Sequence, residues 1–238
     1  MPSLSETTRA ALKTVSTATV STLLFKRGLR NQFMQQVMPL NPGLPTLVGE
    51  AFTLRYIPAR EDLNPLAVFE NPEHPQRKAV ETCPAGAVMV IDSRKDARAA
   101  SAGSILVARL MARGVAGVVT DGGFRDSQDI AALGIPAYHQ RPSAPTNLTL
   151  HQAIDINVPI GCGDVADFPG DIILGDADGV LVIPQHLADE IAQEAVQMSL
   201  FEQYVFEQVK DHGRSITGLY PPTDPQTKLD FERWKSAR

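Results

Sequence analysis

The residues of this chain that could do chemistry gather in one short segment, Thr120-Asp-Gly-Gly-Phe-Arg-Asp126. Its two glycines allow the backbone to turn sharply after a β-branched run, and an arginine and a carboxylate then follow side by side. A guanidinium can clamp a carboxylate or carbonyl oxygen, and a carboxylate can hold a divalent cation directly or through water. Arg125 and Asp126 are therefore the candidate catalytic residues, and Asp126 is also a candidate metal ligand.

The elements before this segment would place it at one edge of a parallel sheet. Residues 86–92 read as an almost wholly apolar strand, a helix begins near Ser104 and stops at Gly114, and residues 115–120 form the next strand. A strand–helix–strand unit makes its two strands parallel, with a right-handed crossover. The carboxyl ends of both strands then meet at one edge, where we expect the helix N-terminus to lie beside the arginine–aspartate pair.

The helix N-terminus would add an anion site. Ser104 is placed to cap the helix, and the free N–H groups of Ile105 and Leu106 would carry partial positive charge. Together with Arg125 they suit a small carboxylate-bearing substrate such as a 2-oxo acid. Arginine–aspartate neighbours are also common as solvated surface pairs, but the glycine turn, the apolar strand and the facing helix favour a site.

The composition excludes several classes of function. Of the 238 residues 43% are hydrophobic, enough for a sizeable core, and a net charge of −5 with a pI near 5.5 indicates no basic surface for nucleic acid. Two cysteines make neither a disulfide framework nor a structural zinc site. No apolar run is long enough to span a membrane, and the first residues lack the apolar core of a signal peptide, which predicts a cytoplasmic protein.

The order of elements predicts a single α/β domain over residues 1–238. It has N-terminal helices at 5–30, a core at about 46–185, and a long C-terminal helix with a Pro-rich tail at 186–238. Residues 58–75 form a loop longer than most connections in compact domains, and hence a possible site loop. We expect strands at 49–57, 86–92, 115–120, 134–138, 157–160, 171–174 and 179–183, and helices at 76–82, 104–113, 126–133 and 186–212.

Other polar residues give weaker signals. Gly161-Cys-Gly163 could cradle an anion but suits a bend between strands, and Asp176 and Asp178 have metal-like spacing but suit a turn before a strand. The chain has no serine nucleophile elbow, Walker loop or dinucleotide-binding glycine motif. His74 suits a loop residue before Pro75, and His139 and His151 match no nucleophile or metal spacing.

Five segments, in order, resemble the RraA-like family, which includes the regulator of ribonuclease activity A and the class II 4-hydroxy-4-methyl-2-oxoglutarate aldolases. The segments are Gly49-Glu-Ala-Phe-Thr53, Cys83-Pro-Ala-Gly-Ala-Val-Met-Val-Ile-Asp92, Gly103-Ser-Ile-Leu106, Gly114-Val-Ala-Gly-Val-Val-Thr-Asp-Gly-Gly-Phe-Arg-Asp126 and Pro169-Gly-Asp-Ile-Ile-Leu-Gly-Asp-Ala-Asp-Gly-Val-Leu-Val-Ile-Pro184. The resemblance implies a compact α/β fold with a swivelling β/β/α core, assembled as homotrimers or homohexamers with active sites between subunits.

The resemblance also implies an activity and a cofactor. Aldolase members bind Mg²⁺ or Mn²⁺ and cleave 4-hydroxy-2-oxo acids to pyruvate, and many decarboxylate oxaloacetate, both through a pyruvate enolate. Carried over by position, Arg125 would hold the oxo or enolate oxygen, and Asp126 would ligate the metal, largely through water. The substrate would bind at the turn of Gly103, Ser104, Ile105 and Leu106, with its carboxylate on the last two amides.

The chain departs from the aldolase members at one position. They carry an aspartate, then 20 residues, then Arg-Asp, and here that spacing before Arg125 falls on Ser104. A hydroxyl adds no negative charge near the metal, so it would weaken the metal site or mark a branch with another substrate. A glutamate from a neighbouring subunit's C-terminal helix would complete the metal shell, with Glu202 as first candidate and Glu194 as second.

Three functions therefore stay open on the sequence. The first is a metal-dependent lyase acting on a 4-hydroxy-2-oxo acid, the second a regulator that binds ribonuclease E without catalysis, and the third a related sugar-acid lyase or dehydratase. Asp126 beside Arg125 favours the first over the second, because a pure binding surface has no need of a metal-holding carboxylate there. Ser104 and the long loop keep the third open.

Overall fold

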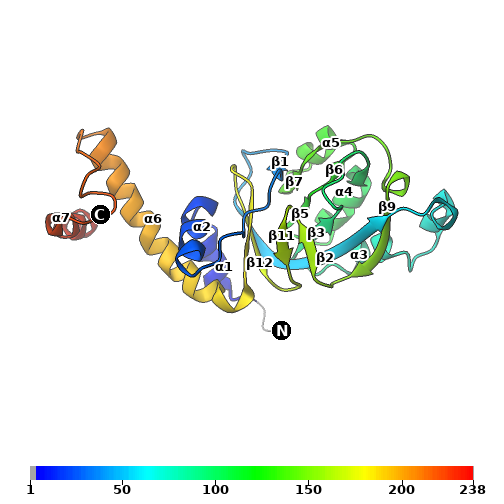
Figure 1. Cartoon of the computed structure of the whole chain (residues 1–238), viewed down its shortest axis with the longest axis horizontal. Helices are drawn as coiled ribbons and strands as arrows, with labels where there is room; N and C mark the ends of the chain where they lie inside the picture. The colour runs from blue at the N-terminus through cyan, green and yellow to red at the C-terminus, as the bar shows by residue number, and fades with distance from the viewer. Residues whose placement is uncertain (1–3, 238) are drawn as a thin grey trace.

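The computed structural model describes residues 4–237, which form a mixed α/β fold around one large sheet (Figure 1). Seven strands lie in the order β1-β7-β5-β3-β2-β12-β13, and an eighth, β9, also pairs with β2. Strand β3 pairs in parallel with both β2 and β5, and β5 in parallel with β7, which confirms the predicted parallel unit. The bounds are β1 Met38–Pro39, β2 Leu47–Pro58, β3 Val88–Asp92, β5 Gly117–Thr120, β7 Ala137–His139, β9 His151–Ile156, β12 Ile172–Gly175 and β13 Val180–Ile183.

Apolar clusters fill both faces of this sheet. On one face, Met89 and Ile91 of β3 join a cluster that includes residues of α3 (Pro75–Thr82), α4 (Ser104–Ala112) and α5 (Ser127–Ala132). The alternate residues Val88 and Val90 pack with the hairpin of β10 (Ile160–Cys162) and β11 (Val165–Asp167). All five residues of β3 are buried, which confirms that this strand is covered on both faces.

The two ends of the chain form a second helical layer. Helices α1 (Glu6–Leu12) and α2 (Thr17–Lys26) lie in the segment 5–30 that was predicted to be helical, and Ser5 and Ser16 cap them. Both contact α6 (Ala188–Lys210), and the three helices pack over β12 and β13 (Figure 1).

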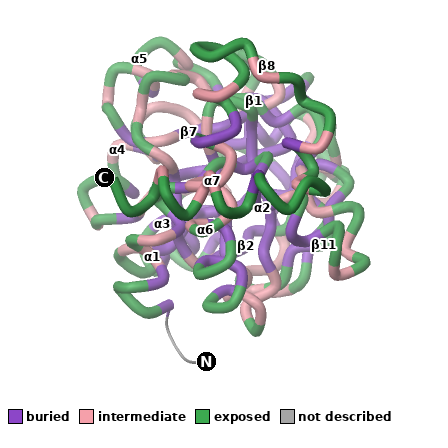
Figure 2. Tube along the Cα trace, turned by 90° about the vertical axis from the view of Figure 1, so that its left-hand side faces the viewer, coloured by how far each residue is buried: buried purple, intermediate pink, exposed green. Residues whose placement is uncertain are grey.

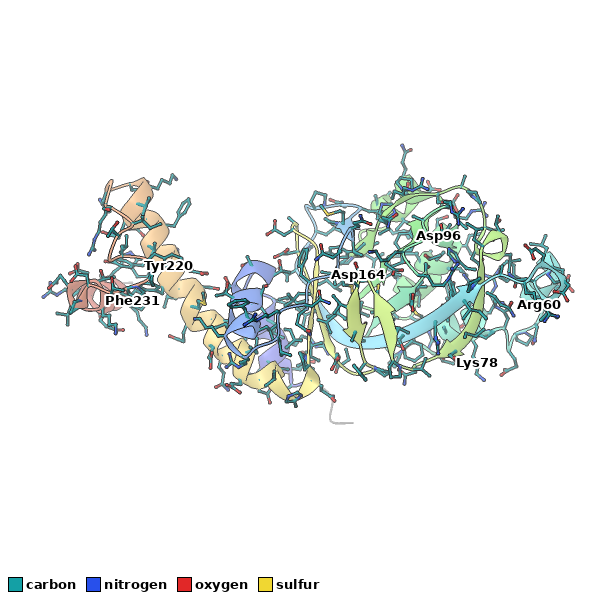
Figure 3. All side chains as sticks on the ribbon, viewed as in Figure 1. Arg60, Lys78, Asp96, Asp164, Tyr220 and Phe231 are labelled. Carbon is teal, nitrogen blue, oxygen red and sulfur yellow. The ribbon has the colours of Figure 1, made fainter. Side chains whose placement is uncertain are left out.

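The far half of α6 extends away from the sheet and carries its own small cluster. Tyr220 and Phe231 lie at this end of the molecule (Figure 3). Phe231 and Trp234 of α7 (Pro225–Ser236) pack on Tyr204, with ring centroids 5.6 Å from it in each case. Figure 2 shows that α7 is mostly exposed. The long C-terminal helix is confirmed, whereas α7 was not predicted within the Pro-rich tail: Pro225 starts it and Asp224 caps it.

The segment 58–75 is an irregular connection, as predicted, with two single-turn 3₁₀ helices, η1 (Glu61–Leu63) and η2 (Leu66–Glu70). A three-stranded parallel sheet that the sequence did not predict lies at the carboxyl ends of the central strands, formed by β4 (Ala100–Ala102), β6 (Gly123–Phe124) and β8 (Arg141–Pro142). A third 3₁₀ turn is η3 (Asn147–Thr149), and a fourth, η4 (Gln185–Leu187), precedes α6. None of the helices within residues 4–237 has the length and apolar character to cross a bilayer.

Gly117, the first residue of β5, tests how tightly the central strands are packed. A Cβ added there would lie 2.6 Å from Leu47 Cδ1 and 2.8 Å from the carbonyl oxygen of Pro136. Gly117→Ala should lower the free energy of unfolding in urea by ~1–3 kcal/mol, because extra volume in a packed core forces shifts. The matched control is Gly161→Ala, whose Cβ would meet no atom within 4 Å; equal losses in both variants would contradict the packing described here.

Candidate functional site

The small parallel sheet brings the arginine–aspartate pair to the start of α4. Ala102, the last residue of β4, lies opposite Phe124 of β6, and the Arg125 N–H donates to the Ala102 carbonyl at 3.1 Å. Helix α4 begins two residues after β4 ends, and Arg125 and Asp126 follow β6 directly. The prediction that the helix N-terminus and the pair share one edge of the sheet is therefore confirmed.

Gly103, between β4 and α4, allows this close approach. A Cβ at Gly103 would lie 2.8 Å from Arg125 Cγ and 3.0 Å from Asp126 Oδ2. Its φ of −123° and ψ of 177° are extended values that any residue adopts. Space, rather than backbone conformation, thus requires glycine at this position.

The Asp126 carboxylate faces α4 rather than the helix that it precedes. Asp126 is the N-cap residue of α5 in the left-handed conformation, φ 55° and ψ 38°, and its side chain makes no cap hydrogen bond there. Its Oδ2 lies 3.4 Å from both N and Oγ of Ser104 and 3.6 Å from Arg125 Nε. With 38% of the side chain exposed, the carboxylate stays open to a ligand.

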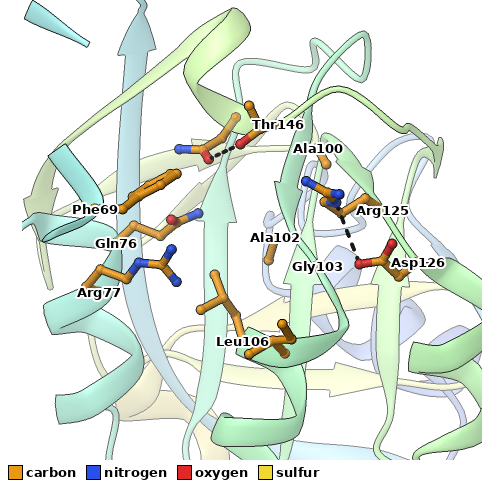
Figure 4. Close-up of a pocket in the computed structure, with 12 residues that line it drawn as sticks. Phe69, Gln76, Arg77, Ala100, Ala102, Gly103, Leu106, Arg125, Asp126 and Thr146 are labelled. Carbon is orange, nitrogen blue, oxygen red and sulfur yellow. Dashed lines mark hydrogen bonds and ion pairs between the residues drawn. The ribbon is translucent and has the colours of Figure 1, made fainter. Parts of the chain in front are cut away.

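A pocket of about 320 Å³ opens beside this carboxylate. Figure 4 shows Arg125 and Asp126 on one side of it and Phe69, Gln76 and Arg77 on the other. The remaining lining residues are Ala100, Ala102, Gly103, Ile105, Leu106, Thr146 and Asn147. The lining therefore carries two arginines and a single carboxylate, so its charge favours an anionic ligand.

Four of the predicted binding and catalytic residues line this pocket with Asp126, and three predicted details differ in the structure. Gly103, not Ser104, is the N-cap of α4. Ser104 is not among the lining residues, and its hydroxyl lies 3.4 Å from Asp126 Oδ2. The Leu106 N–H is not free, since it donates to the Gly103 carbonyl at 3.1 Å. Gly103, Ile105, Leu106 and Arg125 are the residues brought together as predicted.

The two candidate glutamates lie on α6 and have partners within their own chain. Glu202 accepts hydrogen bonds from Thr19 Oγ1 at 2.7 Å and from the Tyr220 hydroxyl at 3.0 Å. Glu194 accepts one from Arg27 Nη2 at 2.6 Å. Neither lines the pocket of its own chain, and the role of Glu202 at a neighbouring subunit's site stays a prediction.

The weaker candidates have structural roles. Gly163 turns the chain between β10 and β11, and Asp176 accepts hydrogen bonds from the N–H and hydroxyl of Thr17 at the start of α2. His74 precedes α3, and burial lowers the pKa of its ring. His139 is buried in the sheet, which lowers its pKa to about 4. His151 is held between Arg94 Nη2 and the Asp96 carbonyl.

One wall of the pocket was missed by sequence reasoning. Gln76 and Arg77 come from the first turn of α3, Phe69 from η2 and Asn147 from η3. The length of the 58–75 loop gave a partial signal, because it predicted a site loop and Phe69 lies on it. Pro75 marks the start of α3, but nothing in the sequence aims the next two side chains at Arg125.

A buried polar network supports β4 from behind the pocket. The Ser101 hydroxyl lies 2.6 Å from Thr120 Oγ1 and 2.7 Å from Ser93 Oγ. The neighbouring Asp121 carboxylate accepts hydrogen bonds from three backbone N–H groups, those of Ser93, Lys95 and Gly163. Burial, with Asp92 nearby, raises the pKa of Asp121 to about 6 against the lowering effect of these N–H groups.

The lining residues offer a limited donor set for a metal. Asp126 is the one carboxylate among them, and no group of three or more His, Cys, Asp or Glu side chains in residues 4–237 is placed to hold an ion. Mg²⁺ is often held by one or two carboxylates with several waters. Asp126 therefore fits as a single protein ligand in a shell completed by water, substrate or another subunit.

Comparison with known proteins identifies the family. The model of the RraA-like family (Aldolase/RraA) matches residues 17–182, which include both sides of the site. The chain belongs to the RraA-like family. The match covers β4, α4 and the Arg125–Asp126 turn, so the family assignment and the pocket concern the same part of the molecule.

Two relatives align with about half of this chain. A Halalkalibacterium halodurans protein named "Putative 4-hydroxy-4-methyl-2-oxoglutarate aldolase" is 38% identical over 118 residues, 50% of this chain and 56% of the relative. An uncharacterized Methanocaldococcus jannaschii protein is 39% identical over 99 residues, 41% of this chain and 46% of the relative. The chain thus spans about half the length of these relatives.

Solved structures resemble nearly the whole fold. An uncharacterized protein from Pseudomonas syringae pv. tomato has a TM-score of 0.78 at 22% identity, covering 92% of this chain and 100% of its own. Streptomyces coelicolor RraAS2, described as an unusual member of the RNase ES inhibitor RraA protein family, has a TM-score of 0.75 at 27% identity, covering 86% and 98%. These neighbours show the mixed α/β fold of the family.

Asp121 should make stability depend on pH in a stated direction. Its folded pKa of about 6 exceeds the ordinary value of 3.8, so the folded state binds more protons between these values. The free energy of unfolding should therefore fall as the pH rises from ~4 to ~6, by ~3 kcal/mol from this group. Urea unfolding across that range should show a smaller fall for Asp121→Asn, whereas Asp211→Asn, exposed after α6, should follow the wild type; parallel curves for wild type and Asp121→Asn would contradict this.

Proposed function

We propose that this protein is a divalent-metal-dependent carbon–carbon lyase that cleaves a 4-hydroxy-2-oxo acid to pyruvate and also decarboxylates oxaloacetate. The observation that carries the proposal is the convergence of Arg125, Asp126 and the first turn of α4 on one pocket. A cation, a carboxylate and a helix N-terminus together suit a ligand with a carboxylate next to a carbonyl group. The names of relatives such as the H. halodurans protein support the same reaction class.

In this proposal the shared end of the substrate binds at α4. Its carboxylate lies at the first turn, where the Ile105 amide and the helix dipole favour an anion. The Arg125 guanidinium donates a hydrogen bond to the 2-oxo oxygen. Because negative charge grows on that oxygen during cleavage, a fixed cation stabilises the transition state more than the bound substrate.

The proposed cleavage breaks the C3–C4 bond. Its electron pair moves to C3 and is shared with the 2-oxo oxygen as an enolate, while the C4 hydroxyl loses its proton and C4 becomes the carbonyl of the second product. A water held by the Asp126 carboxylate takes that proton, and C3 then receives a proton from solvent water to yield pyruvate. With oxaloacetate, the C4 carboxylate leaves as carbon dioxide and the same enolate forms.

Asp126 would hold Mg²⁺ or Mn²⁺, largely through water, and Glu202 of a neighbouring subunit in a trimer or hexamer would add the second carboxylate. A metal held there would supply Lewis-acid stabilisation of the enolate charge. Ser104 contributes a hydroxyl near Asp126 Oδ2 and no charge, so Asp126 alone supplies the negative charge from the central unit.

Arg125→Ala and Asp126→Ala should each lower kcat/KM for pyruvate release by about 10²–10³-fold, because Arg125 meets the developing negative charge and Asp126 holds the water that accepts the proton. A coupled pyruvate assay over 4-hydroxy-2-oxo acids and oxaloacetate, with and without Mg²⁺ or Mn²⁺, measures this. Arg98→Ala is the control, since Arg98 pairs with Asp96 and its side chain is 71% exposed. Full activity after dialysis against EDTA would rule out a metal-dependent reaction.

Ser104→Asp should raise the affinity for Mn²⁺ by about tenfold or more, because a second carboxylate would stand beside Asp126. Isothermal titration calorimetry with Mn²⁺ alone gives the affinity without any need for turnover. Ser104→Asn is the matched control, because asparagine has the size of aspartate and carries no charge. Equal Mn²⁺ affinities for the two variants would mean that position 104 lies outside the metal's reach.

Ribonuclease regulation is the second candidate, favoured by the description of RraAS2 at 27% identity. A ribonuclease-binding function would not need the Arg125–Asp126 pocket, so substitutions in this pocket distinguish the regulator from the lyase. Tight binding of purified ribonuclease E that persists in Arg125→Ala, with no turnover of any oxo acid, would favour the regulator. Turnover that is lost in Arg125→Ala would favour the lyase.

A further inference from the structure

The wall of the pocket that faces Arg125 carries a second cation without an acidic partner. Arg77 lines the pocket and forms no ion pair with any carboxylate of residues 4–237. Its guanidinium carbon lies 4.3 Å from the centroid of the Phe69 ring, which lines the same wall. A partly exposed arginine stacked on an aromatic ring and facing a pocket is well suited to bind an anionic group.

The same wall contains a buried acceptor that lacks a donor. Gln76 is 2% exposed, and its Nε2 donates to the Ser101 carbonyl at 2.8 Å and to the Tyr56 hydroxyl at 2.9 Å. The Ser101 carbonyl can only accept, which fixes the orientation of the amide. Gln76 Oε1 therefore remains the free end, and it has no partner among the described residues. An unpaired buried acceptor costs stability and calls for a donor.

Asn147 provides a second unpaired amide atom at this pocket. It is 4% exposed, its Oδ1 lies 3.2 Å from Thr146 Oγ1, and its Nδ2 has no partner within residues 4–237. Gln76 Oε1 needs a donor and Asn147 Nδ2 needs an acceptor, and a hydroxyl group is both. An ionised carboxylate could satisfy Asn147 but not Gln76, because it has no proton to donate.

We propose that this wall, formed by Arg77, Gln76 and Asn147, binds the half of the substrate that leaves as the second product, and that this half is hydroxylated and ends in a carboxylate. The inference rests on the proposed lyase function and specifies its substrate class. Arg77 binds the terminal carboxylate, and the two amides bind hydroxyl groups between that end and C4. Both amide atoms are buried, so a neighbouring side chain of the pocket wall must shift to admit the ligand.

The test compares kcat/KM for three cleavable substrates that share the same 2-oxo acid end. These are 4-hydroxy-2-oxopentanoate, with a methyl end, 4-hydroxy-2-oxoglutarate, with a carboxylate end, and 4,5-dihydroxy-2-oxoadipate, with a hydroxyl and a carboxylate. We expect kcat/KM to rise in that order. Arg77→Met should reduce the preference for the carboxylate ends over the methyl end by about tenfold or more, and Arg77→Lys should restore part of it.

Gln76→Met should reduce the ratio between the dihydroxy substrate and 4-hydroxy-2-oxoglutarate by about tenfold. The ratio is the informative quantity, because Gln76 also hydrogen-bonds Tyr56 and Ser101. If Gln76 had a purely structural role, the substitution would lower kcat/KM for all three substrates equally. That equal loss would overturn the assignment of Gln76. Arg98→Met is the control and should leave every ratio unchanged, because Arg98 pairs with Asp96 on the surface and does not line the pocket.

Binding of ligands that cannot be cleaved separates this inference from the lyase proposal. 2-Oxoglutarate and 2-oxopentanoate lack the C4 hydroxyl, so calorimetry reports affinity alone. Suppose that no substrate is turned over, that the wild type still binds 2-oxoglutarate more tightly than 2-oxopentanoate, and that Arg77→Met abolishes this difference. The proposed binding of a terminal carboxylate by the wall is then supported, and the proposed lyase function fails. If the wild type binds both ligands equally and cleaves all three substrates at equal kcat/KM, the proposed role of the wall is contradicted, while the lyase proposal is supported.

Discussion

The site depends on one close approach, that of Gly103 to the Arg125–Asp126 turn. Backbone pairing of Ala102 with Arg125 draws the two segments together, and only a residue without a side chain leaves room for Arg125 Cγ and Asp126 Oδ2 beside it. This contact aims the carboxylate at the first turn of α4 and sets the guanidinium at the mouth of the pocket. Arg125 and Asp126, the two charged groups that the proposed bond cleavage uses, are both positioned by it.

A buried hydrogen-bond network holds the surroundings of this contact in one arrangement, and other features of the same segment reduce the stability of the fold. Serine and threonine hydroxyls behind β4 hydrogen-bond one another in a fully buried network, and buried networks of this kind specify one arrangement of their neighbours. Asp126 adopts the left-handed conformation, and Asp121 is buried with a raised pKa. Both features reduce stability, and both lie in the segment that bears the site, where such strain is usually found.

The sequence predicted the half of the site that follows from strand and helix order. Residues 86–92 and 115–120 were recognisable as buried parallel strands because short apolar runs rich in β-branched residues are typical of strands covered on both faces. Parallel neighbours in a sheet have their carboxyl ends at the same edge. The cap of α4 was assigned to Ser104 instead of Gly103, because serine is a favoured N-cap residue and the neighbouring Asp126 was invisible to a local pattern. Strand β9 and helix α7 were missed, since polar and proline-rich segments can be ordered by packing that no local pattern records.

The other half of the pocket could not be predicted, because long-range packing alone brings it to Arg125. Several strands and helices lie in the sequence between the Arg125–Asp126 turn and the residues Gln76 and Arg77, and others lie between that turn and Asn147. No rule of sequence spacing connects them. The two halves also face different demands. In the proposed function, the half at α4 would bind the atoms that every 2-oxo acid shares, and its geometry follows from β4, β6 and the start of α4. The half at Arg77 sits on a loop, a helix start and a 3₁₀ turn, where a change of side chain leaves the sheet intact. Under the proposed lyase function, this division would allow one enolate-stabilising site to serve substrates that differ only in the part that leaves as the second product.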